Sequence, residues 1–304
     1  MVSSKSEGRL LGWLLDRGFD ESQVEKITLS CCNYQSMCED VLDQRIENLV
    51  GLGFLPAQIP KMVTAFPPLL CYLPERITHN LESHRKIGCD WPLLRKAASK
   101  LPSLLAYGPD LLKQKHGAIT GYGFSPEQFA RIFSVQPSNV GLSVETLSSK
   151  LNNLEALGFS RAEVIGMVSA MPVLIGMAET SLTEKTACLG RQMRFPNGYS
   201  FELGDGDIRR MLIANPGILA ASPDRIRKKL RVFVILTEGN KELLIHWARY
   251  WRNSLERIVA RARYLQKIGN EPRRNGTLFW SATNFRKRYG RDIGAETRLP
   301  IVVG

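Results

Sequence analysis

Five glycines, each 35 residues after the one before, constrain this chain more than any other feature of its sequence. They are Gly18, Gly53, Gly88, Gly123 and Gly158. An aromatic residue follows each of them except Gly88, and four prolines keep the same step: Pro67, Pro102, Pro137 and Pro172. Self-similarity at a period of about 20 to 50 residues is typical of repeat proteins, in which each unit packs on its neighbours.

One repeat, residues 158–189, shows the chemistry of the unit most clearly. Gly158 can end the preceding helix in a left-handed conformation. Ser160 and Glu163 have the S-x-x-E spacing of a capping box, which predicts that a helix starts here. Pro172 ends that helix, because the residue before a proline is pushed out of the α region. A short apolar corner and a second helix follow, so the unit is a helical hairpin.

The other repeats carry the same signals. In a hydrophobic staple, the residue before the N-cap packs against the fourth residue of the helix. That fourth residue is apolar in every repeat: Val24, Ile59, Leu94, Phe129 and Val164. Each second helix also carries an aligned aliphatic residue: Ile77, Leu112, Leu147, Leu182 and Ile226. One hairpin cannot bury both faces alone, whereas stacked neighbours can. The sequence therefore predicts an all-α solenoid of about seven repeats of roughly 35 residues, with essentially no sheet.

Three regions follow from this pattern. Residues 1–17 form an N-terminal segment, of which the first eight are polar and predicted to be unstructured. Residues 18–269 form the repeat domain, and residues 270–304 a basic C-terminal tail. The step from Pro172 to Pro216 is 44 residues, so about nine residues are inserted within 191–207, where Phe195-Pro196-Asn197-Gly198 is a turn signal. The insertion either adds a contact or merely lengthens a loop.

The positive charge of the chain is concentrated at one end. The net charge is +12, but the last 80 residues hold 19 Lys and Arg against 6 Asp and Glu, and the preceding residues balance to −1. Such asymmetry favours a polyanion partner, usually nucleic acid, over a merely solvated basic end. The tail mixes basic residues with Phe279, Trp280, Phe285 and Tyr289. These aromatics either stack on bases or cap the end of the repeat array.

The repeat resembles that of a known family. Leu157–Ile175 has the pattern L-G-F-S-x-x-E-V-x-x-M-V-x-x-x-P-x-L-I, and Leu52–Leu70, Tyr122–Val140 and Met211–Leu219 match it in part. This pattern resembles the mitochondrial transcription termination factor (mTERF) family. The resemblance implies a right-handed superhelix of helix–helix–3₁₀ units that binds double-stranded DNA or structured RNA without catalysis.

The resemblance also implies a role in organelle gene expression, in a mitochondrion or a chloroplast: transcription initiation or termination, RNA splicing or ribosome assembly. Transcription or ribosome-assembly proteins would be partners, and we expect a monomer. The beginning of the chain shows neither a secretory signal nor a clear transit peptide. No apolar run reaches the length of about 18 residues that a membrane span needs. The alternative function is a scaffold for protein–protein interaction whose basic tail is incidental.

Two groups of cations are candidates for phosphate contacts. The first is a column at the seventh position of each second helix, occupied by Arg45, Asn80, Lys115, Lys150, Lys185, Lys229 and Arg261. These side chains either form a ladder along a phosphodiester backbone or extend over the core and pair with acids of the next repeat. The second group is a C-terminal cluster: Arg225, Arg227, Lys228, Arg231, Arg249, Arg252, Arg257 and Arg263.

The sequence offers no catalytic pattern. The four histidines, His79, His84, His116 and His246, form no HExxH, and neither a P-loop nor a GxSxG motif occurs. We therefore predict no enzyme activity, no metal site and no cofactor. The six cysteines contain no CxxC pair and are predicted to be small buried hydrophobes.

Overall fold

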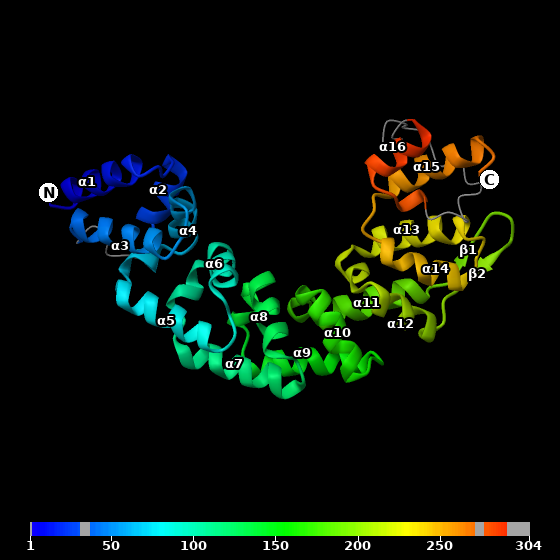
Figure 1. Ribbon diagram of the computed structural model, residues 1–304, viewed down its shortest axis with the longest axis horizontal. Coiled ribbons are helices and arrows are strands. Elements are labelled where there is room, and N and C mark those ends of the chain that lie inside the picture. The colour runs from blue at the N-terminus through cyan, green and yellow to red at the C-terminus, as the bar shows by residue number, and fades with distance from the viewer. Residues whose placement is uncertain (1, 31–36, 271–276, 291–304) are drawn as a thin grey trace. The chain divides into compact units, whose positions relative to one another are not determined.

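The computed structural model describes residues 2–30, 37–270 and 277–290 of the 304-residue chain (Figure 1). The chain forms two compact units, Met1–Leu151 and Asn152–Gly304, each with its own hydrophobic core. Helices dominate both units, which confirms the predicted all-α repeat fold. No helix among the described residues is long and apolar enough to span a membrane.

Unit 1 is a series of helical hairpins. Its α-helices are α1 (Val2–Asp16), α2 (Glu21–Thr28), α3 (Glu39–Gly51), α4 (Ile59–Ala65), α5 (Pro74–Lys86), α6 (Trp91–Lys100), α7 (Pro109–Tyr122) and α8 (Pro126–Val135). Short 3₁₀ helices lie between them: η2 (Pro56–Gln58), η3 (Pro67–Cys71), η4 (Pro102–Ala106) and η5 (Pro137–Gly141). Helix α9 (Val144–Ala156) runs from unit 1 into unit 2. Because α1 begins at Val2, the prediction that the first eight residues lack structure is wrong for residues 2–8.

Unit 2 continues the pattern with one addition. Its helices are α10 (Arg161–Ala170), η6 (Pro172–Gly176), α11 (Glu179–Gly190), α12 (Asp205–Ala214), η7 (Pro216–Ala220), α13 (Pro223–Leu236), α14 (Lys241–Trp247), η8 (Ala248–Tyr250), α15 (Leu255–Lys267), η9 (Thr277–Phe279) and α16 (Ala282–Tyr289). The addition is a hairpin of two short antiparallel strands, β1 (Met193–Arg194) and β2 (Ser200–Phe201). This hairpin lies in the predicted insertion and is the sole exception, among the described residues, to the expected absence of sheet.

Local chemistry sets the ends of the helices. The five repeat glycines all have a positive φ, between 82° and 119°, so each ends a helix in the conformation that glycine tolerates best. The corner prolines each begin a five-residue 3₁₀ helix, and Pro216 does the same. The predicted capping box is present, since the carboxylate of Glu163 accepts a hydrogen bond from the Ser160 backbone N–H at 2.8 Å.

The hairpins stack on one another within each unit. In unit 1, α2 packs on α4, α6 on α8, and α5 on α7. In unit 2, α10 packs on α12, α12 on α14, α11 on α13, and α13 on α15. First helices therefore contact first helices and second helices contact second helices, as in a solenoid. The predicted staple residues and the aligned aliphatics of the second helices are all buried.

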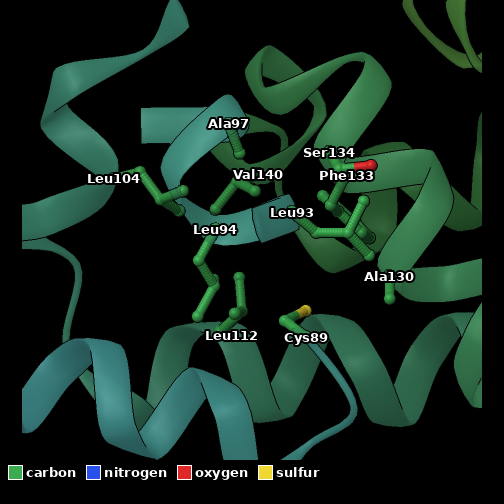
Figure 2. A pocket seen from close by; sticks show the side chains of 10 residues that line it. All are labelled: Cys89, Leu93, Leu94, Ala97, Leu104, Leu112, Ala130, Phe133, Ser134 and Val140. Atoms are coloured by element: carbon green, nitrogen blue, oxygen red, sulfur yellow. The ribbon is translucent and has the colours of Figure 1, made fainter. Parts of the chain in front are cut away.

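Cys89 takes the place that a phenylalanine has in four other repeats. Figure 2 shows it among apolar side chains from three helices, including Leu94 of α6, Leu112 of α7 and Phe133 of α8. The cavity that these residues line has a volume of about 10 Å³, which is room for at most one water molecule. Burial, with a smaller contribution from Asp90, raises the pKa of the Cys89 thiol to about 12, so the thiol stays neutral.

The prediction for the other cysteines holds in part. Cys188 is buried, whereas Cys38 and Cys71 are exposed, contrary to the expectation that all are buried. Cys31 and Cys32 lie outside the described residues.

Candidate nucleic-acid interface

The column of seventh-position residues points to the backbone of the next repeat. Asn80 Nδ2 donates to the carbonyl of Leu105 at 3.0 Å, and Lys185 Nζ to the carbonyl of Leu219 at 2.9 Å. Lys115 Nζ donates to the carbonyl of Leu142. Each acceptor lies at the C-terminal end of a 3₁₀ corner, where carbonyls lack partners within the helix.

The last two members of the column make the same kind of contact. Lys229 Nζ donates to the carbonyls of Trp251 and Asn253, and the guanidinium of Arg261 to those of Leu278 and Trp280. Lys115, Lys229 and Arg261 are buried, with 3%, 8% and 0% of their surface exposed. Burial is the main cause that lowers the pKa of Lys229, to about 8, and the nearby Arg225 adds to it.

These contacts favour a structural role for the column over a ladder of phosphate contacts. The acceptors are main-chain carbonyls of the next repeat and not the acidic side chains that had been expected there. Arg45 is half-buried, and its Nε makes no hydrogen bond within the described part of the chain. Lys150 occupies the corresponding place on α9 and is also half-buried.

Exposed cations gather instead along α13, where they line two grooves of unit 2. The first, here called the hairpin groove, lies between the insertion and α13 and has a volume of about 300 Å³. Five cations line it, namely Arg191, Arg194, Arg227, Lys228 and Arg231, together with Cys188, Gln192 and Met193. No carboxylate is present among these lining residues. A surface with this composition suits an anion.

Contacts within the hairpin groove orient two of its cations. Arg227 Nη1 lies 3.6 Å from the Sγ of Cys188, and the guanidinium carbon of Arg231 lies 4.9 Å from the centre of the Phe195 ring. Lys228 is paired with Asp224 at 2.8 Å, one helical turn away. The hydrogen bond from Lys228 is the first cause that lowers the pKa of the Asp224 carboxyl.

The second groove, here called the α13–α15 groove, has a volume of about 570 Å³. Arg225, Lys228 and Arg252 are exposed along it, and the buried Lys229 also contributes to its lining. It contains two carboxylates, Asp224 and Glu256, so its charge is less one-sided than that of the hairpin groove. Lys228 lines both grooves, which therefore adjoin.

The remaining predicted cations are separate from these grooves. Arg249 is exposed on η8, and Arg257 and Arg263 are half-buried on α15. None of the three belongs to the described lining of either groove.

The aromatics of the C-terminal tail pack against unit 2. Phe279 stacks on Tyr250 with ring centres 4.3 Å apart, and Phe285 is fully buried beneath the guanidinium of Arg261. This placement supports the capping alternative for these two residues, while Trp280 remains 38% exposed. Helix α16 carries exposed Arg286, Lys287 and Arg288, and the tail residues Arg273, Arg274 and Arg291 lie outside the described residues.

Two residues of the hairpin groove, Arg191 and Arg194, were not among the predicted contacts. In the sequence, only the insertion itself pointed to these two residues, because neither falls at a position that recurs from repeat to repeat. Their approach to α13 depends on how the hairpin folds back. In the part of the chain that the structure describes, no three His, Cys, Asp or Glu side chains cluster in a way that could hold a metal ion.

A comparison with models of protein families agrees with these features. The mTERF model matches residues 72–198, which include three of the 3₁₀ corners and the first strand of the hairpin. No curated protein matches the chain. The match, the 35-residue hairpins and their proline-led corners together identify residues 72–198 as a repeat region of the mTERF family.

Proposed function

We propose that this protein binds nucleic acid, without catalysis, through the cations exposed along α13. The observation that carries the proposal is that the two grooves flanking α13 adjoin at Lys228 and are lined by exposed Arg225, Arg227 and Arg252. Cations that neutralise phosphates release condensed counterions, which supplies affinity for a polynucleotide of any sequence. The match to the mTERF family supports the same ligand.

The ligand is double-stranded DNA or structured RNA. Guanidinium and ammonium groups on phosphate fix the position of a polynucleotide but read no bases. The cations of the two grooves therefore account for affinity, and sequence choice requires further contacts. Lys115, Lys229 and Arg261 contribute little to this surface, because each is buried and bonded to carbonyls.

The proposed role is regulation of organelle gene expression. The family supports a mitochondrial or chloroplast location and a step such as transcription initiation or termination, RNA splicing or ribosome assembly. The protein acts as a monomer, with transcription or ribosome-assembly proteins as its partners.

The proposal is tested by the salt dependence of binding. Fluorescence anisotropy with labelled duplex DNA and with a structured RNA, over a series of salt concentrations, gives the slope of log affinity against log salt. We expect a steep slope for at least one polymer, and a slope reduced by about two in the Arg225→Gln/Arg252→Gln double variant, since each lost phosphate contact removes about one.

A matched control separates local contacts from net charge. Lys61 and Lys96 are exposed on unit 1, and Lys61→Gln/Lys96→Gln removes the same charge far from α13 in the sequence. The control should bind like the wild type. Absence of binding at low salt, or a flat salt response, would overturn the proposal and favour the scaffold for protein interactions.

A further inference from the structure

The inserted hairpin adds cations that the other repeats do not have. It leaves α11 at Gly190 and carries Arg191 and Arg194 to the side of α13, where Arg227 and Arg231 also lie. Arg191, Arg194 and Arg227 are exposed, and Arg231 is half-buried. Neither Arg191 nor Arg194 forms an ion pair with any residue that the structure describes.

The hairpin is anchored to unit 2, so its cations have a defined place. Phe201 and Leu203 at its end are buried, with 3% and 2% exposure. The Tyr199 side chain lies directly over Gly239, where a Cβ would be only 2.0 Å from the hydroxyl oxygen. The ring of Phe195 lies against the guanidinium of Arg231 at 4.9 Å. The arginines therefore belong to an anchored element, and less entropy is lost when they bind a ligand.

Grouping five cations without a carboxylate carries an electrostatic cost. Like charges that converge on one groove repel one another. Of these five cations, only Lys228 forms an ion pair within the described residues, with Asp224. An anion in the groove would remove this repulsion. Arginine suits phosphate in particular, because its planar fork can donate two parallel hydrogen bonds to the oxygens.

We infer that the hairpin groove binds phosphate groups of the polynucleotide backbone, with Arg191 and Arg194 as its specific contribution. The groove is a second attachment point beside the α13–α15 groove, and Lys228 connects the two. The inference rests on the proposed function, because the same polynucleotide occupies both grooves. On this inference the insertion adds a contact and does not merely lengthen a loop.

The test is the salt slope of an Arg191→Gln/Arg194→Gln double variant, measured on the polymer that the wild type binds. We expect the magnitude of the slope to fall by about two, with weaker binding at every salt concentration. The Arg191→Lys/Arg194→Lys variant keeps both charges and should retain most of the slope. The Lys61→Gln/Lys96→Gln variant again serves as the control for net charge.

The outcomes separate this inference from the proposed function. If the wild type binds with a steep slope and the arginine-to-glutamine variant behaves like the lysine control, the hairpin groove is not a phosphate site and the function stands. If the wild type itself does not bind nucleic acid, both fail. If the double variant instead loses an acidic protein partner and keeps its affinity for nucleic acid, the inference is also overturned. Unchanged thermal unfolding of the variant verifies that any loss is local.

Discussion

Lys185 on α11 donates a hydrogen bond from its Nζ to the main-chain carbonyl of Leu219, 2.9 Å away at the end of the next corner. The bond joins one repeat to its successor across 34 residues of sequence. Asn80, Lys115, Lys229 and Arg261 do the same at their own places in the column. A side chain with more than one N–H donor thus satisfies carbonyls that a 3₁₀ corner leaves without partners.

Replacing Lys185 by methionine should destabilise unit 2 by about 1–3 kcal/mol, because the carbonyl of the buried Leu219 loses its donor while the aliphatic stem is kept. Urea unfolding followed by circular dichroism measures the change. Lys267→Met, at an exposed position of α15, is the matched control and should change little. If Lys185→Met leaves stability unchanged but flattens the salt slope of binding, Lys185 contacts phosphate and our structural assignment is wrong.

His84 should make the stability of unit 1 depend on pH. Burial is the main cause that lowers its pKa from 6.5 to about 4, and backbone groups of Tyr107 and Gly108 offset only part of this. Between pH 6.5 and pH 4, His84 is therefore protonated in more of the unfolded chains than of the folded chains. The free energy of unfolding should therefore fall as pH decreases from about 6.5 to 4, by about 3 kcal/mol in total.

The measurement is chemical unfolding at a series of pH values for the wild type and His84→Leu. The variant should lose this part of the pH dependence, because leucine does not titrate. His79→Leu, on the exposed side of the same helix, should retain it. An identical pH profile for wild type and His84→Leu would contradict the assignment.

Cys89→Phe should destabilise unit 1 by about 1–3 kcal/mol even though phenylalanine is the usual residue at this place in the repeat. The adjoining cavity of about 10 Å³ is far too small for the added ring. Cys89→Val adds little volume and should cost less than about 1.5 kcal/mol. Thermal unfolding compares the two, and a phenylalanine variant as stable as the wild type would show that α6 and α8 can move apart.

Gly239→Ala should destabilise the junction of the hairpin with α13. Its φ of +71° is unfavourable for alanine, and the new Cβ would also collide with the Tyr199 side chain. Gly198→Ala is the matched control, since its φ is +80° and no atom lies within 4 Å of the added Cβ. Both variants should lose about 1–2 kcal/mol to backbone strain. Chemical unfolding compares the two variants. A larger loss of unfolding free energy in Gly239→Ala than in Gly198→Ala measures the collision with Tyr199. Equal losses would mean that the Tyr199 side chain moves away freely.

The tertiary structure was needed for every contact that spans two elements. From the sequence the column of cations was compatible with phosphates, acids or solvent, because a lysine side chain is long and flexible. The carbonyls that accept its bonds become neighbours only after the next corner has folded. Likewise, the turn signal Phe195-Pro196-Asn197-Gly198 predicted a turn in the insertion but not that Arg191 and Arg194 would lie beside Arg227.

The sequence by itself determined the repeat, the ends of its helices and the residues of its core. Gly158 ends one helix, Ser160 and Glu163 cap the next and Pro172 starts the corner, and each of these effects acts over at most about four residues. Only the tertiary structure decided which cations are buried as links between repeats and which remain exposed along α13. Local conformational preferences can be derived from neighbouring residues, whereas the fate of a charge depends on partners that folding brings from elsewhere in the chain.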